Sequence, residues 1–337
     1  MRRESRPVAE QTSTGGDASA TSRVMIDVAT VLLEFQSSGR LVPWLGPAVR
    51  GVVAGRFRER HCVLPLAEQT GRWRRCRGCT HLRDCAYGRI FEPDEQILPR
   101  AAVTAAAGGD VPRAVVLSPA FPAPVRAERG LRLPVSIVAI GSAARSALGE
   151  VVDVLAEAGR AGVFGTDRLR FAVAERSDGP MRLSLDAASL PDGVNGSNGV
   201  IPRVRVVLTS PLFLRDRDAD GRPVPCRAPS LHRLVRAAVD TVAAVAYVHG
   251  VPVASNTRSL VALAQDVRTV AEDWRTFDQE KHSNRSRSRF EVRGVVGEAV
   301  FADVPRAVVP WLALAGQLHV GGHRVAGAGA WRIEFGR

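Results

Sequence analysis

Hydrophobic positions in the first half of the chain follow a strand period in some segments and a helical period in others. Residues 24–35 are apolar and rich in β-branched side chains, which is typical of a strand. Residues 46–60 open with Gly-Pro and then carry apolar side chains at helical spacing. Together the two periods predict strands at 24–35, 114–117, 131–140 and 169–173, and helices at 46–60 and 143–160. The predicted element order of this half is β-α-β-β-α-β.

A similar order returns after residues 190–202 (LPDGVNGSNGVIP), which are rich in turn-forming residues. Ser230 follows a proline and is placed to cap a helix that runs to about His249. The periods predict strands at 204–214, 290–301 and 330–335, and helices at 230–249, 258–272 and 305–318. This order is again close to β-α-β-β-α-β, the split βαβ or ferredoxin-like arrangement.

The repeated order predicts an α+β protein with two tandem ferredoxin-like domains. The predicted segments are a disordered tail at 1–22, a first domain at 23–185, a linker at 186–202 and a second domain at 203–337. The first domain contains a cysteine-rich loop at 61–93, and the second contains a glycine-rich loop at 319–330. A fold of this kind is suggestive of RNA handling but does not establish it.

The net charge narrows the partner class. The chain carries 46 basic and 34 acidic residues, a formal net charge of +12, and Lys281 is its single lysine. Such a balance favours a polyanionic partner, nucleic acid before membrane, and the alternative is a solvated arginine-rich surface. No apolar run approaches the ~20 residues of a membrane span, and the polar N-terminus lacks the apolar core of a signal peptide. We therefore expect a cytoplasmic protein with no membrane partner.

Four of the five cysteines fall within the loop at 61–93 with the spacing C-x13-C-x2-C-x5-C. Thiols stay reduced in the cytoplasm, so clustered cysteines indicate a metal rather than disulfides. A C-x2-C knuckle with two further cysteines supplies the four ligands of a structural zinc site, which would be closed to substrate. The predicted ligands are Cys62, Cys76, Cys79 and Cys85, with His61 and His81 as substitutes. Unligated thiols and an iron–sulfur cluster are the alternatives.

Six segments in a fixed order carry a family resemblance: WLGPAVRGVVAGRFRERHC (44–62), CRGCTHLRDCAYGRIFEP (76–93), LGEVVDVLAEAGRAGVFGTDRLRFAVAE (148–175), SLHRLVRAAVDTVAAVAYVHG (230–250), DQEKHSNRSRSRFEVRGVVGEAVFAD (278–303) and LHVGGHRVAGAGAWRIEF (318–335). In this order and spacing they resemble the CRISPR-associated endoribonucleases that process precursor crRNA, which are members of the RAMP superfamily. The similarity is to the branch with a cysteine cluster and a glycine-rich C-terminal domain. The last two segments are the most diagnostic.

The resemblance implies cleavage of CRISPR repeat RNA by attack of a ribose 2′-OH, without a catalytic metal, to leave a 2′,3′-cyclic phosphate. It also implies that the loop at 319–330 contacts RNA or its own domain partner. On the RNA interpretation, backbone N–H groups of the loop glycines approach phosphates and arginines supply charge. The residues expected to bind RNA are Arg50, Arg285, Arg287, Gly321, Gly322, Arg324, Gly327 and Gly329. The alternative is a loop that only packs the last helix on the last strand.

Histidine suits the acid and base roles of such a cleavage because its pKa lies near neutrality. His61 ends the first predicted helix, where many relatives carry a catalytic histidine. His323 and His319 flank the paired glycines, and His282 lies in the basic run KHSNRSRSR. We therefore expect the catalytic set to come from His61, His323 and His282, in that order, ahead of His319. Relatives often have Gly-Lys-Gly where this chain has Gly-Gly-His, so the set stays open.

A different function class fits the same features. A non-catalytic subunit that holds crRNA in a CRISPR effector complex needs the same basic surface, and the sequence does not separate the two. A zinc-dependent DNA-binding regulator is disfavoured because the chain has no recognisable helix-turn-helix. A nucleoside triphosphate site is disfavoured because no G-x-x-x-x-G-K-[ST] pattern is present.

Overall fold

The computed structural model describes residues 23–64, 76, 79–94, 112–164, 167–176, 181–186, 190, 199–251, 253, 257–283 and 288–336. The predicted tail at 1–22, much of the cysteine loop and most of the linker lie outside these residues. Among the described helices, none is long and apolar enough to cross a membrane.

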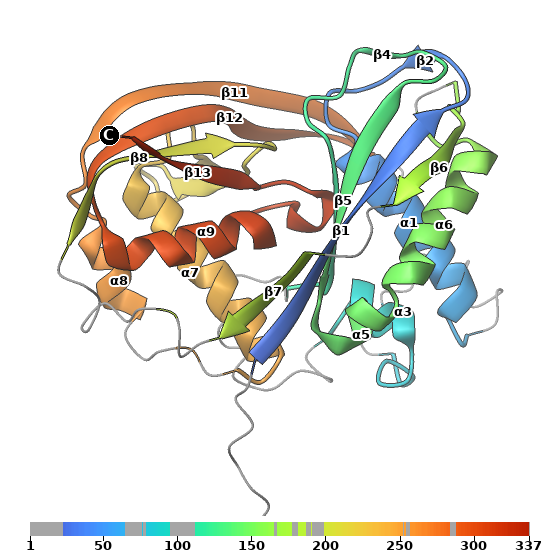
Figure 1. The fold of residues 1–337 in the computed structure, drawn as a ribbon, viewed down its shortest axis with the longest axis horizontal. Helices are drawn as coiled ribbons and strands as arrows, with labels where there is room; N and C mark the ends of the chain where they lie inside the picture. The colour runs from blue at the N-terminus through green and yellow to red at the C-terminus, as the bar shows by residue number, and fades with distance from the viewer. Residues whose placement is uncertain are drawn as a thin grey trace, which may run out of the picture.

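The first domain is a sheet covered on one side by two helices (Figure 1). Its elements are β1 (Arg23–Phe35), β2 (Gly39–Arg40), α1 (Gly46–His61), α3 (Ala86–Phe91), β3 (Val115–Pro119), β4 (Arg126–Ala127), β5 (Arg132–Ile140), α5 (Gly141–Ser146), α6 (Leu148–Ala161), β6 (Phe171–Arg176) and β7 (Met181–Asp186). The main sheet has the antiparallel order β3-β5-β1-β6, and β7 also pairs with β1. Central β1 is 13 residues long, so β6 and β7 both pair along one of its edges.

The second domain repeats this topology. Its elements are β8 (Val200–Leu208), β9 (Arg215–Arg217), β10 (Pro223–Pro225), α7 (Leu231–Val248), α8 (Thr257–Leu263), β11 (Thr269–Ser283), β12 (Ser288–Pro305), the 3-10 turn η3 (Arg306–Val308), α9 (Val309–Leu318), the 3-10 turn η4 (Arg324–Ala326) and β13 (Trp331–Gly336). The sheet order β11-β12-β8-β13 places the first strand between the third and fourth, as in the first domain. Ser230 caps α7 as predicted, because its hydroxyl accepts a hydrogen bond from Arg233 N at 3.3 Å. The predicted tandem ferredoxin-like fold is confirmed.

Several predicted boundaries are wrong. The helix predicted at 258–272 ends at Leu263, and Thr269 begins the 15-residue strand β11. Most described side chains of β11 are exposed, so the strand has no apolar alternation, and pairing with β12 determines its conformation instead. The helix predicted at 143–160 is divided at Ala147 into α5 and α6. Strand β8 begins at Val200, inside the predicted linker, where it pairs with Pro305 of β12.

The two domains share an apolar boundary along β1. Val24 and Ile26 belong to the hydrophobic cluster built around α7 and α9 of the second domain. Val31 and Leu33 belong to the first domain's own core with α1 and α6. The long central strand is therefore buried on both faces, which is why residues 24–35 form a nearly continuous apolar run.

The β11–β12 hairpin extends past the second sheet and reaches the first domain, as the upper part of Figure 1 shows. Gln279 of β11 accepts a hydrogen bond from Trp44 N at 3.0 Å and donates one to Trp44 O at 3.0 Å. The Trp44 ring contacts Phe277 of the same strand and Phe213, with centroid distances of 6.4 and 5.2 Å. Trp44, two residues before α1, is therefore held by the hairpin through both its backbone and its ring.

Replacing Gln279 with alanine removes both hydrogen bonds and leaves the part-buried N–H and C=O of Trp44 without them. We expect the free energy of unfolding to fall by about 1–3 kcal/mol. The comparison variant Thr276→Ala changes an exposed side chain on the same strand and should stay within about 0.5 kcal/mol of wild type. Chemical denaturation measures both changes, and equal stability of the two variants would contradict the role given to Gln279.

Candidate functional site

The glycine-rich loop is anchored by buried polar side chains. His319 is buried, its Nδ1 lies 3.1 Å from Ala328 O, and burial lowers its pKa to about 4. Arg324 donates from Nε to Leu318 O at 2.8 Å and from a terminal nitrogen to Arg113 O of the first domain at 3.2 Å. Burial lowers the pKa of Arg324 to about 10. The guanidinium is buried and bonded to two carbonyls, so it anchors the loop within the protein. Its contact with RNA stays a prediction.

Two of the loop glycines allow close backbone contacts inside the protein. Gly327 has φ +75°, and a Cβ there would lie 2.5 Å from Ser118 Cα and 2.8 Å from Leu117 O of the first domain. Gly329 has φ +77°, and a Cβ would lie 1.9 Å from Val320 O. Both residues are buried, so these glycines serve packing of the loop on the first domain and on itself. In its C-terminal part the loop therefore contacts its own domain partner, which is one of the two contacts that the resemblance implied.

The first part of the loop faces solvent instead. Gly321 and Gly322 are exposed, and Gly322 N donates to Phe213 O at 2.9 Å. His323 is half-buried and has φ +56°, an uncommon backbone conformation for a histidine. Its ring lies 5.2 Å from the Phe213 ring and 5.9 Å from the Trp44 ring, centroid to centroid. The exposed glycine pair and His323 thus lie at the point where the two domains meet.

The β11–β12 hairpin lies close to the same point. Gln279, which holds Trp44, is three residues before His282 on β11, and His282 pairs in register with Arg289 of β12. Arg285 and Arg287 lie outside the described residues. Three segments that are distant in sequence therefore meet at the junction: the residues before α1, the β11–β12 hairpin and the start of the glycine loop.

His61 is in a different environment, at the C-terminal end of α1. Its Nε2 lies 2.7 Å from Glu150 Oε1 of α6, and its ring stacks on Phe57 at 4.3 Å. Arg60 pairs with the same Glu150 at 3.6 Å and also with Glu157. One arginine is thus shared by two carboxylates, and the site around His61 is not cationic.

The length of α1 separates the two histidine sites. The helix runs from Gly46 to His61, a rise of roughly 22 Å at 1.5 Å per residue. His323 contacts Trp44, just before the helix, whereas His61 is its last residue. One phosphate therefore does not contact both side chains.

Arg50, another residue expected to bind RNA, is on α1 and lies near Tyr87 of α3. Burial raises the pKa of Tyr87, and the positive charge of Arg50 opposes that rise.

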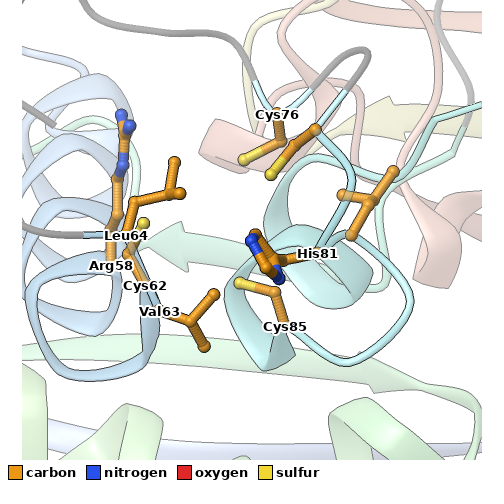
Figure 2. Close-up of a pocket in the computed structure, with 9 residues that line it drawn as sticks. Arg58, Cys62, Val63, Leu64, Cys76, His81 and Cys85 are labelled. Carbon is orange, nitrogen blue, oxygen red and sulfur yellow. The ribbon is translucent and has the colours of Figure 1, made fainter. Parts of the chain in front are cut away.

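The four clustered cysteines line a single pocket between α1 and α3 (Figure 2). Cys62 and Arg58 come from the α1 side, and Cys76, His81 and Cys85 come from the opposite side. The four cysteines are free thiols that form no disulfide, and burial raises the pKa of Cys76 to about 12. Within the described part of the chain, no three His, Cys, Asp or Glu side chains are already arranged as a metal site.

Comparison with known proteins identifies the family. Residues 206–331 match the family model described as CRISPR-associated endoribonuclease Cas6, and residues 25–182 match a model described as an N-terminal domain. The chain is a Cas6-type protein. No curated protein sequence matches this Cas6-type chain.

Solved structures agree with the fold of this Cas6-type protein. A Cas6 product complex is 14% identical, with a TM-score of 0.52 over 92% of this chain and 99% of that one. The Cas6-containing chain of a partial Cas6–RT–Cas1–Cas2 complex is 12% identical, with a TM-score of 0.53 over 93% of this chain and 46% of that one. At these identities the likeness establishes the fold alone.

Trp44, Phe213, Gln279 and Glu150 take part in these sites and were not identified from the sequence. Trp44 and Gln279 lie within segments that carry the family resemblance, but nothing in the sequence indicates that they bond to each other. Their sequence separation is 235 residues.

Gly327→Ala tests whether the loop requires close packing on the first domain. The added methyl would meet Ser118 and Leu117 backbone atoms, so we expect a loss of stability about 1–3 kcal/mol larger than that of Gly130→Ala. Gly130 is the matched control, because it has φ +86° and no atom within 4 Å of a built Cβ. Thermal or urea unfolding of both variants provides the measurement. Equal losses would mean that backbone strain alone, and not contact with the first domain, explains Gly327.

Proposed function

We propose that this Cas6-type protein binds CRISPR repeat RNA at the domain junction and cleaves it beside His323, without a catalytic metal. The observation that carries the proposal is the meeting of His323, the exposed Gly321–Gly322 pair and the β11–β12 hairpin, through Gln279 and Phe277, at the domain junction. Membership in the Cas6 family supports an RNA-processing role.

Charge favours the junction over the His61 site. A phosphate at His61 would approach Glu150 and Glu157, with Arg60 already paired to both. The hairpin run KHSNRSRSR instead carries Lys281, Arg285, Arg287 and Arg289 with no acidic residue inside it, and Glu280 just before it pairs with Arg289 at 3.4 Å. Phosphate binding depends on cations, so the RNA backbone fits the hairpin side of the molecule.

The geometry also favours a structural role for His61. Its hydrogen bond to Glu150 joins the end of α1 to α6, and its stacking on Phe57 joins it to the first domain's core. His323 instead lies half-exposed between two aromatic rings, with a backbone conformation typical of residues held in place by their surroundings. An imidazole in that position meets a ligand that enters between the domains.

In the proposed reaction, His323 takes the proton from a ribose 2′-OH. The 2′-oxygen attacks the adjacent phosphorus, and the bond from phosphorus to the 5′-oxygen breaks. The products are a 2′,3′-cyclic phosphate and a 5′-hydroxyl that receives a proton. His282 is the candidate acid for that proton, since its backbone lies in β11 three residues beyond Gln279. Hairpin arginines stabilise the charged phosphorane.

Cleavage by this route should continue when metal ions are chelated, and it should require the ribose 2′-OH at the cut site. We expect the cognate repeat to be cut at an unchanged rate during a brief incubation with EDTA, and not at all when a 2′-deoxy nucleotide precedes the cut. Denaturing gels of end-labelled repeat measure both, and mass spectrometry of the product identifies the cyclic phosphate. A requirement for added Mg²⁺, or cleavage of the deoxy substrate, would reject the mechanism.

The base is identified by comparing His323→Asn with His61→Asn. Asparagine tolerates the left-handed backbone at 323 and removes the imidazole, so the fold should be kept. We expect His323→Asn to slow single-turnover cleavage by about 10²–10⁴-fold with repeat affinity nearly unchanged. His61→Asn should lower stability but reduce the rate of the folded protein only slightly. A reversed pattern would assign the chemistry to His61.

A non-catalytic crRNA-binding subunit is the second candidate. The observation in its favour is that the predicted histidines do not converge on one point, because α1 separates His61 from His323. Tight repeat binding by the wild type without any cleavage would select this function. The partner would then be a CRISPR effector complex, and copurification with its subunits would be the direct test.

A further inference from the structure

The pocket between α1 and α3 contains a cluster of cysteine side chains that have no role in the proposed RNA cleavage. Nine residues line it, and they include the four clustered cysteines and His81: Arg58, Cys62, Val63, Leu64, Cys76, Cys79, His81, Leu82 and Cys85. The fifth cysteine, Cys226, is buried in the second domain's core instead. The four cysteines come from three places in the chain, so their meeting is a product of the fold.

The local backbone around the pocket resembles a metal-binding knuckle. Cys79 N donates to Cys76 O at 2.9 Å, which closes a tight turn across the C-x2-C pair. Cys85 N donates to His81 O at 3.0 Å, so the next thiol is held one turn further along the chain. Thiolates at such spacing are the ligands that Zn²⁺ takes in closed tetrahedral sites.

Charge around the pocket fits a thiolate site. Zn²⁺ with four thiolates carries a net charge of −2, which is costly to bury without a nearby cation. Arg58 is 7% exposed, lines the pocket and lies over the Tyr87 ring at 5.7 Å. A guanidinium on the pocket wall would balance part of the charge of the loaded site.

We propose that Cys62, Cys76, Cys79 and Cys85 bind one structural Zn²⁺ that fastens the end of α1 to α3. In the described residues these thiols line one pocket but are not arranged at metal-binding positions, so metal binding would have to bring the four sulfurs together. Cys85 Sγ already lies 3.5 Å from His61 O, so the bound metal would hold the last turn of α1 directly.

The first test is the metal content of the purified full chain. We expect about one zinc per chain, lost in Cys76→Ser and Cys85→Ser and retained in the matched control Cys226→Ser. X-ray absorption of the wild type should show four sulfur ligands at about 2.3 Å, which keeps the test valid if a cysteine variant fails to fold. Full zinc in His81→Ala would exclude that histidine as a ligand.

The second test measures stability rather than activity. Stripping the wild type with a strong chelator should lower Tm by several degrees, and Zn²⁺ but not Mg²⁺ should restore it. Four thiols should react in the stripped folded protein and not in the loaded one. Three results would overturn the proposal. One is a wild type that folds without metal and whose Tm does not change when Zn²⁺ is added. The others are zinc that is retained after two pocket cysteines are replaced, and bound iron with a visible absorption band. None of these results depends on RNA cleavage, so the zinc site and the proposed function succeed or fail separately.

Discussion

Close contact between the glycine loop and the first domain determines the geometry of the junction. Gly327 lies against Ser118 and Leu117 without room for a side chain, and Arg324 bonds to Arg113 O of the same domain. Trp44 Nε1 donates to Ala326 O at 3.2 Å, so the start of α1 is tied to the same loop. If the loop moved away, Arg324 would lose buried partners and Trp44 would lose a buried acceptor, which is costly. The two domains are therefore held in one arrangement around this contact.

That arrangement divides the loop into an exposed part and a buried part. The C-terminal part, from Arg324 to Gly329, is buried and serves as the anchor, whereas Gly321 and Gly322 remain exposed beside His323. A rigid anchor next to an exposed pair of glycines holds backbone in a fixed position without bulky side chains to block a ligand, and the Gly322 N–H there already donates to Phe213 O. Many exposed arginines on the second sheet are paired within the protein, as Arg205 is with Glu298 and Glu334. The total of 46 basic residues thus overstates the number of basic side chains that are free to meet RNA.

The fold was largely predictable because both domains repeat a strong pattern. β1 and α7 are long and apolar in the right period, and Ser230 marks a helix start in the sequence itself. β11 was not predictable, since its polar, exposed positions carry no strand period and its partner β12 determines its structure.

The candidate site was predicted only as a set of residues. Whether Arg324 faces RNA or its own domain depends on contacts with Arg113, which is 211 residues away, and no local pattern contains that information. The same applies to His61, whose role depends on Glu150 of α6.

The central claim is that RNA is cut at the domain junction and not at the far end of α1. Photocrosslinking tests it directly, with an uncleavable 2′-deoxy repeat that carries a photoreactive base at the cut. After trypsin digestion, His323 lies in the peptide 307–324 and His61 in the peptide 61–72. We expect the crosslink in peptide 307–324 or in the hairpin, and a crosslink confined to peptide 61–72 or to α6 would contradict the account.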